Sequence, residues 1–457
     1  MVESNAPRSV HSVLRRPLVL IVLAGLAIRF VLMPLLTYDY DMYHWAVIFE
    51  NIKSGNNLYD LTGYFYTPVW GYMMGGIYAF SDLFLNVDSL GTTFTNMLPI
   101  EVLAHRFHIA TITTVQFNML MKVPLVICDI VVGYIIYKLI LGRTGDRKKA
   151  TYGFGLWFLC PIVIYMSAVQ AMFDTISALL LLLTVFMLYK DKCFIAGALF
   201  SVAFLLKFFP VFCIFVLIGY ICVRHRDDGL IKRKVISMAL GGLIMTVILM
   251  LPQIINGQMD DALLFITGRA SASDSYSSIF TLLGVAFAGF GMLYFGHRMF
   301  RTRKEDADKA LFENIFFAMT CAVLMSITPQ YVIVLIPFLI IHIMTTDFNY
   351  RKCWIIISVG AFGGALILNN FSLLCSIAEY TTLVSPEWIV SSMQALEGTI
   401  FGVTYVNIIN VFFNLMQYAG LVLIIAFHFL ESIGSKSPKL GTAISKLKNA
   451  GVRKSEV

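Results

Sequence analysis

The chain has 457 residues and a formal net charge of +7, and only 13% of its residues are charged whereas 58% are hydrophobic. Soluble domains usually carry about 25% charged residues, and the mean hydropathy here is +0.79, so the composition excludes an ordinary soluble globular protein. Continuous apolar runs of ~20 residues predict helices rather than the alternating strands of a barrel. We therefore expect one all-α polytopic membrane domain over residues 1–457.

Lys and Arg are concentrated in short stretches between the apolar runs, and such stretches mark the cytoplasmic side of a membrane protein. They occur at the N-terminus, in 142–149, 224–234, 297–309 and 349–352, and in the tail 430–457, which we expect to be cytoplasmic. By contrast, residues 373–404 contain three Glu and no Lys or Arg. Because these basic runs are topology signals, they give no support to nucleic-acid binding.

This alternation of charge predicts about twelve transmembrane helices with both ends in the cytoplasm. The expected spans are 17–36, 116–141, 151–169, 171–189, 193–208, 209–223, 235–252, 279–296, 310–328, 331–346, 353–372 and 405–429. The first two spans enclose a large first outer loop, 37–115. If its apolar stretch 69–85 crossed the membrane, 142–149 would face outward against the charge rule, so we expect an interfacial or re-entrant helix there.

At the outer end of the first span lies the sequence YDYDMYHWA, residues 38–46, which contains the acid pair Asp39 and Asp41. One interpretation is an aromatic belt at the membrane surface with two solvated acids. The other is a catalytic carboxylate beside aromatic rings that stack on a sugar. The candidate rings are those of Tyr43, Trp45, Tyr64 and Tyr66. Under either interpretation we expect both acids to be exposed.

Four basic residues lie on the outer side, where the charge rule does not expect them. They are Arg106, Lys122, Lys207 and Arg269. Each alone could be an anchor whose charged end extends to the membrane surface. Together they could bind an anionic head group, for which a lipid phosphate is the natural candidate.

Two acids lie within apolar segments, where a charge is costly and is usually paired or functional. We expect Asp129 in the second span to pair with Arg29, which lies at a similar depth in the first span. Asp174 and Gln170 lie near the outer surface. They either line the same cavity as the basic residues or belong to a polar part of the core.

These motifs, in this order, resemble the C-type (GT-C) glycosyltransferases, and most closely the GPI mannosyltransferase I family and its bacterial lipid-mannosyltransferase relatives. The resemblance covers most of the chain before residue 340, with an insertion at 84–114 and a poor match in the C-terminal third. The matched positions are Asp39, Asp41, Gly55, Tyr59, Tyr64, Tyr66, Thr67, Pro68, Lys122, Cys128, Asp129, Lys207, Pro210, Gln330, Tyr331 and Pro337.

The resemblance implies inverting transfer of a hexose, with mannose as the family default, from a polyprenyl-phosphate sugar. The acceptor would be a glycolipid, a glycan or a protein at the non-cytoplasmic face. One of Asp39 and Asp41 would act as the general base, and the motif does not choose between them. The substrate-binding candidates are Tyr43, Trp45, Tyr64, Tyr66, Arg106, Lys122, Asp174, Lys207, Arg269, Gln330 and Tyr331.

No metal ligands are assigned, because the cysteines and histidines show no metal-binding spacing. The acid pair nevertheless leaves a divalent cation as an open alternative. No other cofactor is expected besides the lipid-linked sugar donor.

A transporter or flippase for lipid-linked sugars is the main alternative function, and a non-enzymatic assembly scaffold is a third. Transporters usually show internal repeats and polar residues at the midplane. This chain shows no repeat, and its polar residues gather at the outer rim. Since no endoplasmic-reticulum retention signal ends the chain, we expect a multi-pass protein of a prokaryotic plasma membrane, with the endoplasmic reticulum membrane as the alternative.

Overall fold

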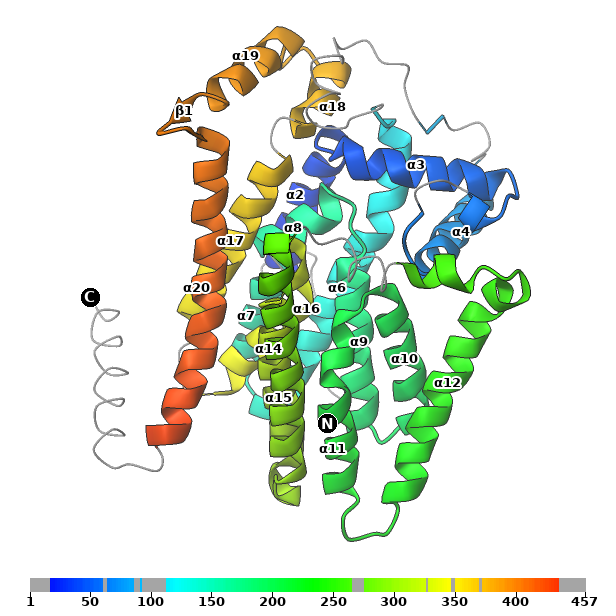
Figure 1. Ribbon diagram of the computed structural model, residues 1–457, viewed down its shortest axis with the longest axis vertical. Helices are drawn as coiled ribbons and strands as arrows, with labels where there is room; N and C mark the ends of the chain where they lie inside the picture. The colour runs from blue at the N-terminus through cyan, green and yellow to red at the C-terminus, as the bar shows by residue number, and fades with distance from the viewer. Residues whose placement is uncertain are drawn as a thin grey trace, which may run out of the picture.

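The computed structural model describes residues 17–60, 64–85, 91–92, 112–264, 275–325, 328–346, 350–369 and 372–434. In these ranges the protein is a bundle of helices, and the sheet is limited to a two-stranded hairpin, β1 Thr399–Ile400 and β2 Val403–Thr404. The all-α prediction is therefore confirmed. Figure 1 shows the long helices running side by side, with α3 (Asp39–Lys53) lying across one end.

The helices occur in the chain order that the apolar runs predicted. The first half comprises α2 Pro17–Leu35, α3, η1 Leu58–Asp60, α4 Pro68–Asp82, α6 Val115–Thr144, α7 Arg147–Phe158, α8 Pro161–Ala168, α9 Asp174–Tyr189, α10 Cys193–Leu206, η3 Phe209–Cys213 and α11 Ile214–Arg224. The second half comprises α12 Ile231–Ile255, α14 Ser275–Phe300, η4 Lys304–Asp306, α15 Ala307–Val323, η5 Pro329–Tyr331, α16 Val332–Thr345, α17 Arg351–Asn369, α18 Ser372–Tyr380, α19 Pro386–Leu396 and α20 Tyr405–Gly434.

Each of the twelve predicted spans overlaps a helix, or two consecutive helices, of the described chain. Within the described residues, four helical segments are long and apolar enough to cross a membrane: Pro17–Leu35, Val115–Thr144, Ile231–Ile255 and Tyr405–Ser432. The pair α7 and α8, bent by 50°, would make a fifth. Several other apolar helices have fewer than 18 residues, so the number twelve stays a prediction. The helix expected within 69–85 is α4, and its relation to the membrane also stays a prediction.

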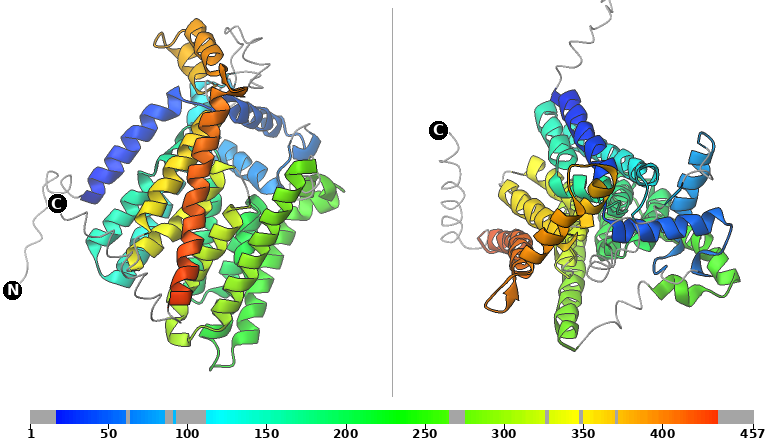
Figure 2. Two further views of the ribbon diagram at one scale, coloured as in Figure 1. Left: turned by 60° about the vertical axis from the view of Figure 1, so that its left-hand side comes forward. Right: turned by 90° about the horizontal axis from the view of Figure 1, so that it is seen from above.

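The short helix α16 lies at the centre of the bundle, whereas several of the longest helices lie on its outside. All residues of α16 from Val332 to Met344 are buried, as expected for a helix that is apolar on every face. It packs against α6, α7, α9, α15 and α17. By contrast, α2 and α12 bury few of their residues, and Figure 2 shows α2, α12 and α20 at the periphery.

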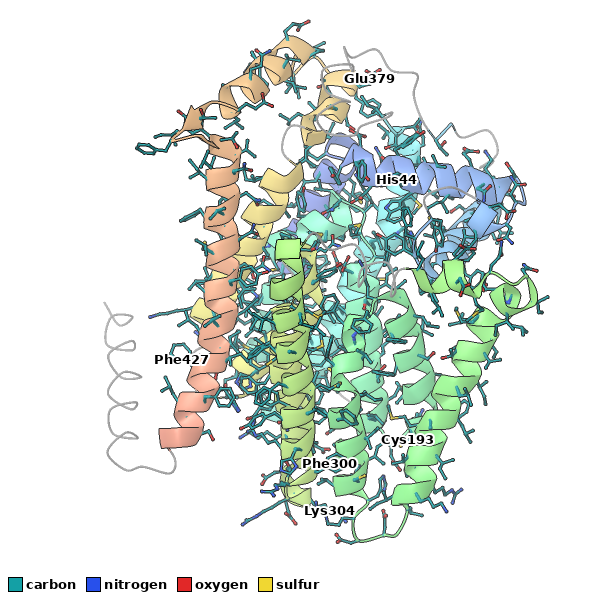
Figure 3. All side chains as sticks on the ribbon, in the orientation of Figure 1. His44, Cys193, Phe300, Lys304, Glu379 and Phe427 are labelled. Atoms are coloured by element: carbon teal, nitrogen blue, oxygen red, sulfur yellow. The ribbon has the colours of Figure 1, made fainter. Side chains whose placement is uncertain are left out.

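The two ends of the bundle differ in character. The turn between α11 and α12 and the turn between α14 and α15 lie at the end opposite α3 (Figure 1). Figure 3 shows Lys304 at this end and both His44 and Glu379 at the other. We call these the basic end and the α3 end. The helices α18 and α19 and the hairpin, which come from the segment without Lys or Arg, lie at the α3 end (Figure 1).

A buried ion pair joins the first two long helices, as predicted. Arg29 Nε and Nη2 donate to Asp129 Oδ2 at 3.0 and 2.8 Å, and both side chains are fully buried. Ser167 Oγ donates to the same oxygen at 2.6 Å, and Trp157 Nε1 donates to the Asp129 carbonyl at 2.8 Å. The pair therefore connects α2, α6, α7 and α8, and it serves the packing of the bundle.

Replacing Arg29 by Met should lower the free energy of unfolding by about 3 kcal/mol or more, because it leaves the buried carboxylate of Asp129 without its counter-charge. Unfolding of the purified protein in detergent, followed by circular dichroism, measures this loss. The double variant Arg29→Met/Asp129→Leu should recover much of it, since no buried charge is then unpaired. A single variant as stable as the parent would contradict the assignment.

Candidate functional site

The two acids of the first outer loop lie in the first turn of α3, where carboxylates favour the helix N-terminus. Residues two apart on a helix do not face the same side, and Asp39 and Asp41 accordingly contact different groups. Asp39 is fully buried, so the expectation that both acids are exposed is wrong for Asp39. The reason is that α18, from the C-terminal third, packs on α3. Asp41 remains partly exposed.

Asp39 lies in an enclosed, mostly apolar environment. Ser376 Oγ of α18 donates to Asp39 Oδ1 at 3.5 Å, and the other carboxyl oxygen makes no hydrogen bond within the described part of the chain. Burial raises the pKa of Asp39 to about 8, against the opposing effects of the nearby Lys122 ammonium, the Thr113 backbone N–H and the Ser376 hydroxyl. The carboxyl group therefore holds its proton at neutral pH.

Lys122 is fully buried beside Asp39, and its side chain lies at the C-terminus of α2. Its Nζ donates to the Met33 carbonyl at 3.0 Å, to the Leu36 carbonyl at 2.9 Å and to Thr37 Oγ1 at 2.9 Å. The Met33 carbonyl is one of those that a helix leaves without a partner at its C-terminus, and Leu36 and Thr37 directly follow α2. Since all three ammonium hydrogens have acceptors, Lys122 positions the chain that enters α3.

Asp41 faces a second group of residues at the break between α8 and α9. Gln170 Nε2 donates to Asp41 Oδ2 at 3.0 Å, and Ala171 in the same break has a φ of 54°. Burial raises the pKa of Asp41 to about 6; the Gln170 hydrogen bond and Lys207 lower it, whereas Asp174 raises it. Asp41 is thus an ionised carboxylate at neutral pH, in electrostatic contact with a buried ion pair.

That ion pair consists of Lys207 and Asp174, with Nζ and Oδ2 3.3 Å apart and side chains that are 1% and 0% exposed. Lys207 follows the last residue of α10 in an extended conformation, and Asp174 begins α9. Besides this ion pair, Lys207 Nζ makes no hydrogen bond to any residue that the structure describes. A buried ammonium with spare donors can bind an anionic oxygen.

Aromatic rings surround the Lys207 ammonium. Nζ lies 4.5 Å from the centre of the Phe173 ring, 5.4 Å from that of Tyr331 and 5.9 Å from that of Tyr66. The Phe173 ring in turn stacks on Trp70 at 4.6 Å. Such rings stabilise a cation by cation–π attraction. This attraction offsets part of the free-energy cost of burying the Lys207 charge.

The predicted aromatic residues have different environments. Tyr43 and Tyr66 are half-buried, whereas Trp45 and Tyr64 are 3% and 5% exposed. The Tyr64 hydroxyl donates to the Thr67 carbonyl at 2.7 Å and accepts from the Gly71 N–H at 3.0 Å. Tyr64 therefore fixes the turn that leads into α4.

The structure brings together some of the predicted residues and leaves others apart. Asp41, Asp174, Lys207, Tyr66 and Tyr331 form one cluster, and Lys122 lies beside Asp39 instead. Gln330 is 8% exposed, next to Tyr331 in η5. Arg106 and Arg269 lie outside the described residues.

Sequence reasoning did not select three residues of the site: Phe173, Trp70 and Ser376. Phe173 precedes Asp174 and Trp70 follows the Tyr-Thr-Pro motif, so neighbouring motifs offered a weak signal for both. Nothing in the sequence around Ser376 indicates its contact with Asp39. Among the described residues, no group of three or more His, Cys, Asp or Glu could hold a metal ion.

No family model matches the chain. A search of curated proteins finds similarity to GPI mannosyltransferase 1 of Saccharomyces cerevisiae, with 34% identity over 109 residues, which are 24% of this chain and 26% of the yeast protein. The matched segment thus spans about a quarter of the length of that relative. The similarity thus relates one segment of the chain to a mannosyltransferase, and the long apolar helices indicate a membrane protein.

Proposed function

From its similarity to a mannosyltransferase, we propose that the protein is an inverting glycosyltransferase of the GT-C type. It transfers a hexose, mannose in the first instance, from a polyprenyl-phosphate sugar to a hydroxyl group of a glycolipid, glycan or protein at the non-cytoplasmic face. The observation that carries the proposal is the placement of Asp41 beside the buried Lys207–Asp174 ion pair at the α3 end. A base and a cation are the two groups that this reaction needs.

Asp41 acts as the general base. The acceptor oxygen attacks the anomeric carbon as its proton passes to the Asp41 carboxylate, and the bond from that carbon to the phosphate oxygen breaks. The electron pair of this bond leaves with the polyprenyl phosphate. A base works best with a pKa near the working pH, and the pKa of Asp41, about 6, meets this condition. Asp39 is less suited, because it is enclosed and protonated.

Lys207 stabilises the departing phosphate. The leaving group gains negative charge as the bond breaks, and a pre-positioned cation in a site of low polarity opposes that charge most strongly. Lys207 Nζ has an ion pair with Asp174 and unused hydrogen-bond donors. Both features allow it to donate to a phosphate oxygen while Asp174 keeps the ammonium in place. The half-buried Tyr66 ring is the nearest candidate for stacking on the sugar.

The proposal is tested by incubating the purified protein with polyprenyl-phosphate mannose and a panel of mannosylated glycolipid acceptors. Mass spectrometry should detect the extended acceptor together with free polyprenyl phosphate. Polyprenyl-phosphate glucose and polyprenyl-phosphate arabinose serve as alternative donors. Movement of the intact donor across a vesicle membrane without release of polyprenyl phosphate would instead identify a transporter.

The pH dependence of kcat/KM should report the pKa of Asp41. Only the ionised carboxylate accepts a proton, so kcat/KM should rise about tenfold per pH unit below pH 6 and level off above about pH 7. Initial rates of transfer between pH 4.5 and 9 measure this. A midpoint near pH 8 would point to Asp39 instead, and a flat profile would exclude both acids as the base.

A further inference from the structure

An apolar cavity of about 270 Å³ lies between α10, α11 and α12, and its lining includes no residue of the Asp41 site. Its lining is formed mainly by Gly197, Phe200, Phe204, Ile218, Met238 and Ala239. Ala239 is exposed and Phe200, Phe204 and Ile218 are partly exposed, so the cavity opens on the surface of the helix bundle. It therefore provides space for an apolar ligand.

The polar groups in the lining are already satisfied. Ser201 Oγ and Thr246 Oγ1 share a hydrogen bond of 2.6 Å across the cavity, and Thr246 Oγ1 also bonds to the Gly242 carbonyl at 2.9 Å. A buried water needs two to four polar partners, and these hydroxyls offer few. The chemistry of the lining thus favours a hydrocarbon chain over solvent.

The length and position of the cavity match one leaflet of a bilayer. Its lining residues on α12 extend from Val235 to Thr246, about 16 Å along the helix axis at 1.5 Å per residue. Half of a hydrocarbon core of about 30 Å has nearly the same thickness. Val235 is the fifth residue of α12, which begins at the basic end. Most of the lining on α12 therefore lies in the half of that helix nearer the basic end.

Two exposed cations lie at the start of α12, next to the cavity. Lys232 and Arg233 are exposed and form no ion pair with a described residue, whereas the neighbouring Lys234 pairs with Asp191. Cations in the first turn of a helix are unfavourable with respect to the helix dipole. An anion bound at this position would offset that cost.

We propose that this cavity binds one acyl chain of an anionic phospholipid from the leaflet at the basic end, with Lys232 and Arg233 contacting its phosphate-containing head group. The chain lies in the cavity bordered by α10, α11 and α12, beside the seam at which Gly197 and Gly241 bring α10 and α12 into backbone contact. This lipid site is separate from the Asp41 site and does not depend on the proposed glycosyl transfer.

The test is a titration of the delipidated full-length protein with dioleoyl phosphatidylglycerol, or with dioleoyl phosphatidylcholine, followed by native mass spectrometry. Phosphatidylglycerol should bind at least tenfold more tightly. The double variant Lys232→Glu/Arg233→Glu should weaken its binding about tenfold or more, as expected for two basic groups near an anionic lipid, and should leave phosphatidylcholine unaffected. The matched change Lys148→Glu/Lys149→Glu, which alters exposed lysines of α7, should have little effect.

A second pair of variants tests the cavity itself. Ala239→Phe occupies part of the cavity and should weaken binding of both phospholipids, whereas Leu240→Phe, at the next residue and outside the lining, should not. The proposal is overturned if neither Ala239→Phe nor the charge-reversed double variant changes phosphatidylglycerol binding. It is equally overturned if polyprenyl phosphate displaces phosphatidylglycerol and loses its own binding in Ala239→Phe, because the cavity would then serve the donor chain.

Discussion

Replacing Asp41 by Asn is expected to lower kcat by about 10²–10⁴-fold, the scale of a lost general base. The amide is nearly isosteric with the carboxylate but cannot accept the proton of the attacking hydroxyl. The fold should survive, because Asp41 is partly exposed and its hydrogen bond from Gln170 can equally be made to an amide oxygen. Initial rates of sugar transfer and the melting temperature of the same preparation measure the two effects.

Asp39→Asn is the matched control on the same helical turn. Its carboxyl group is enclosed and protonated at neutral pH, so a neutral amide should replace it with a loss of activity below about tenfold. If this variant loses activity as severely as Asp41→Asn while remaining folded, Asp39 would be the base. If neither variant loses activity, the site is not where the reaction occurs.

Lys207→Met should produce the other large effect, a loss of kcat of about 10²–10³-fold, the magnitude found when one stabiliser of a developing charge is removed. The same variant should also be less stable, because Asp174 is fully buried and loses its counter-charge. Transfer rates and unfolding in detergent separate the two consequences.

The double variant Lys207→Met/Asp174→Asn distinguishes chemistry from folding. It removes both charges of the pair, so stability should return towards that of the parent. Activity should not return, since the ammonium that faces the phosphate is still missing. Recovery of both properties would show that Lys207 serves only the packing of α9 against α10.

The sequence allowed prediction of contacts in which a charge within an apolar segment requires a partner of opposite charge. Arg29 and Asp129 lie at similar depths of consecutive apolar runs, and a charge in such a run requires a counter-charge; the structure confirms their ion pair. The helical class followed from the same continuous runs. The order of basic turns likewise predicted that α3 and the segment 373–404 would share an end of the bundle (Figure 1).

The burial of Asp39 could not be predicted, because the residue that covers it is distant in the chain. Ser376 is separated from Asp39 by 337 positions, and no periodicity or spacing links the two segments. Burial has different consequences for the two acids. Asp39 is enclosed and protonated, whereas Asp41 is the accessible, ionised carboxylate. The acid pair alone left that choice open.

The role of Tyr64 illustrates a different difficulty. A tyrosine in a loop at the membrane surface is compatible with sugar stacking, with an interfacial belt and with a turn. Only the contacts show that the Tyr64 hydroxyl bridges Thr67 and Gly71. Side-chain direction in irregular segments depends on tertiary packing, which the local sequence does not encode.

The lengths of the short helices α9 and α10 determine the depth within the bilayer at which the proposed reaction would occur. Asp174 begins α9, which has 16 residues, and Lys207 follows α10, which has 14; at 1.5 Å per residue these helices are about 24 and 21 Å long. A bilayer interior is about 30 Å thick. Measured from the turn at the basic end, the Lys207–Asp174 pair therefore lies several ångströms short of the opposite head groups. A phosphate carried by a lipid would have to move below the level of the head groups to reach this pair, or the surrounding membrane would have to be thinner there. The acceptor hydroxyl would have to reach the same depth.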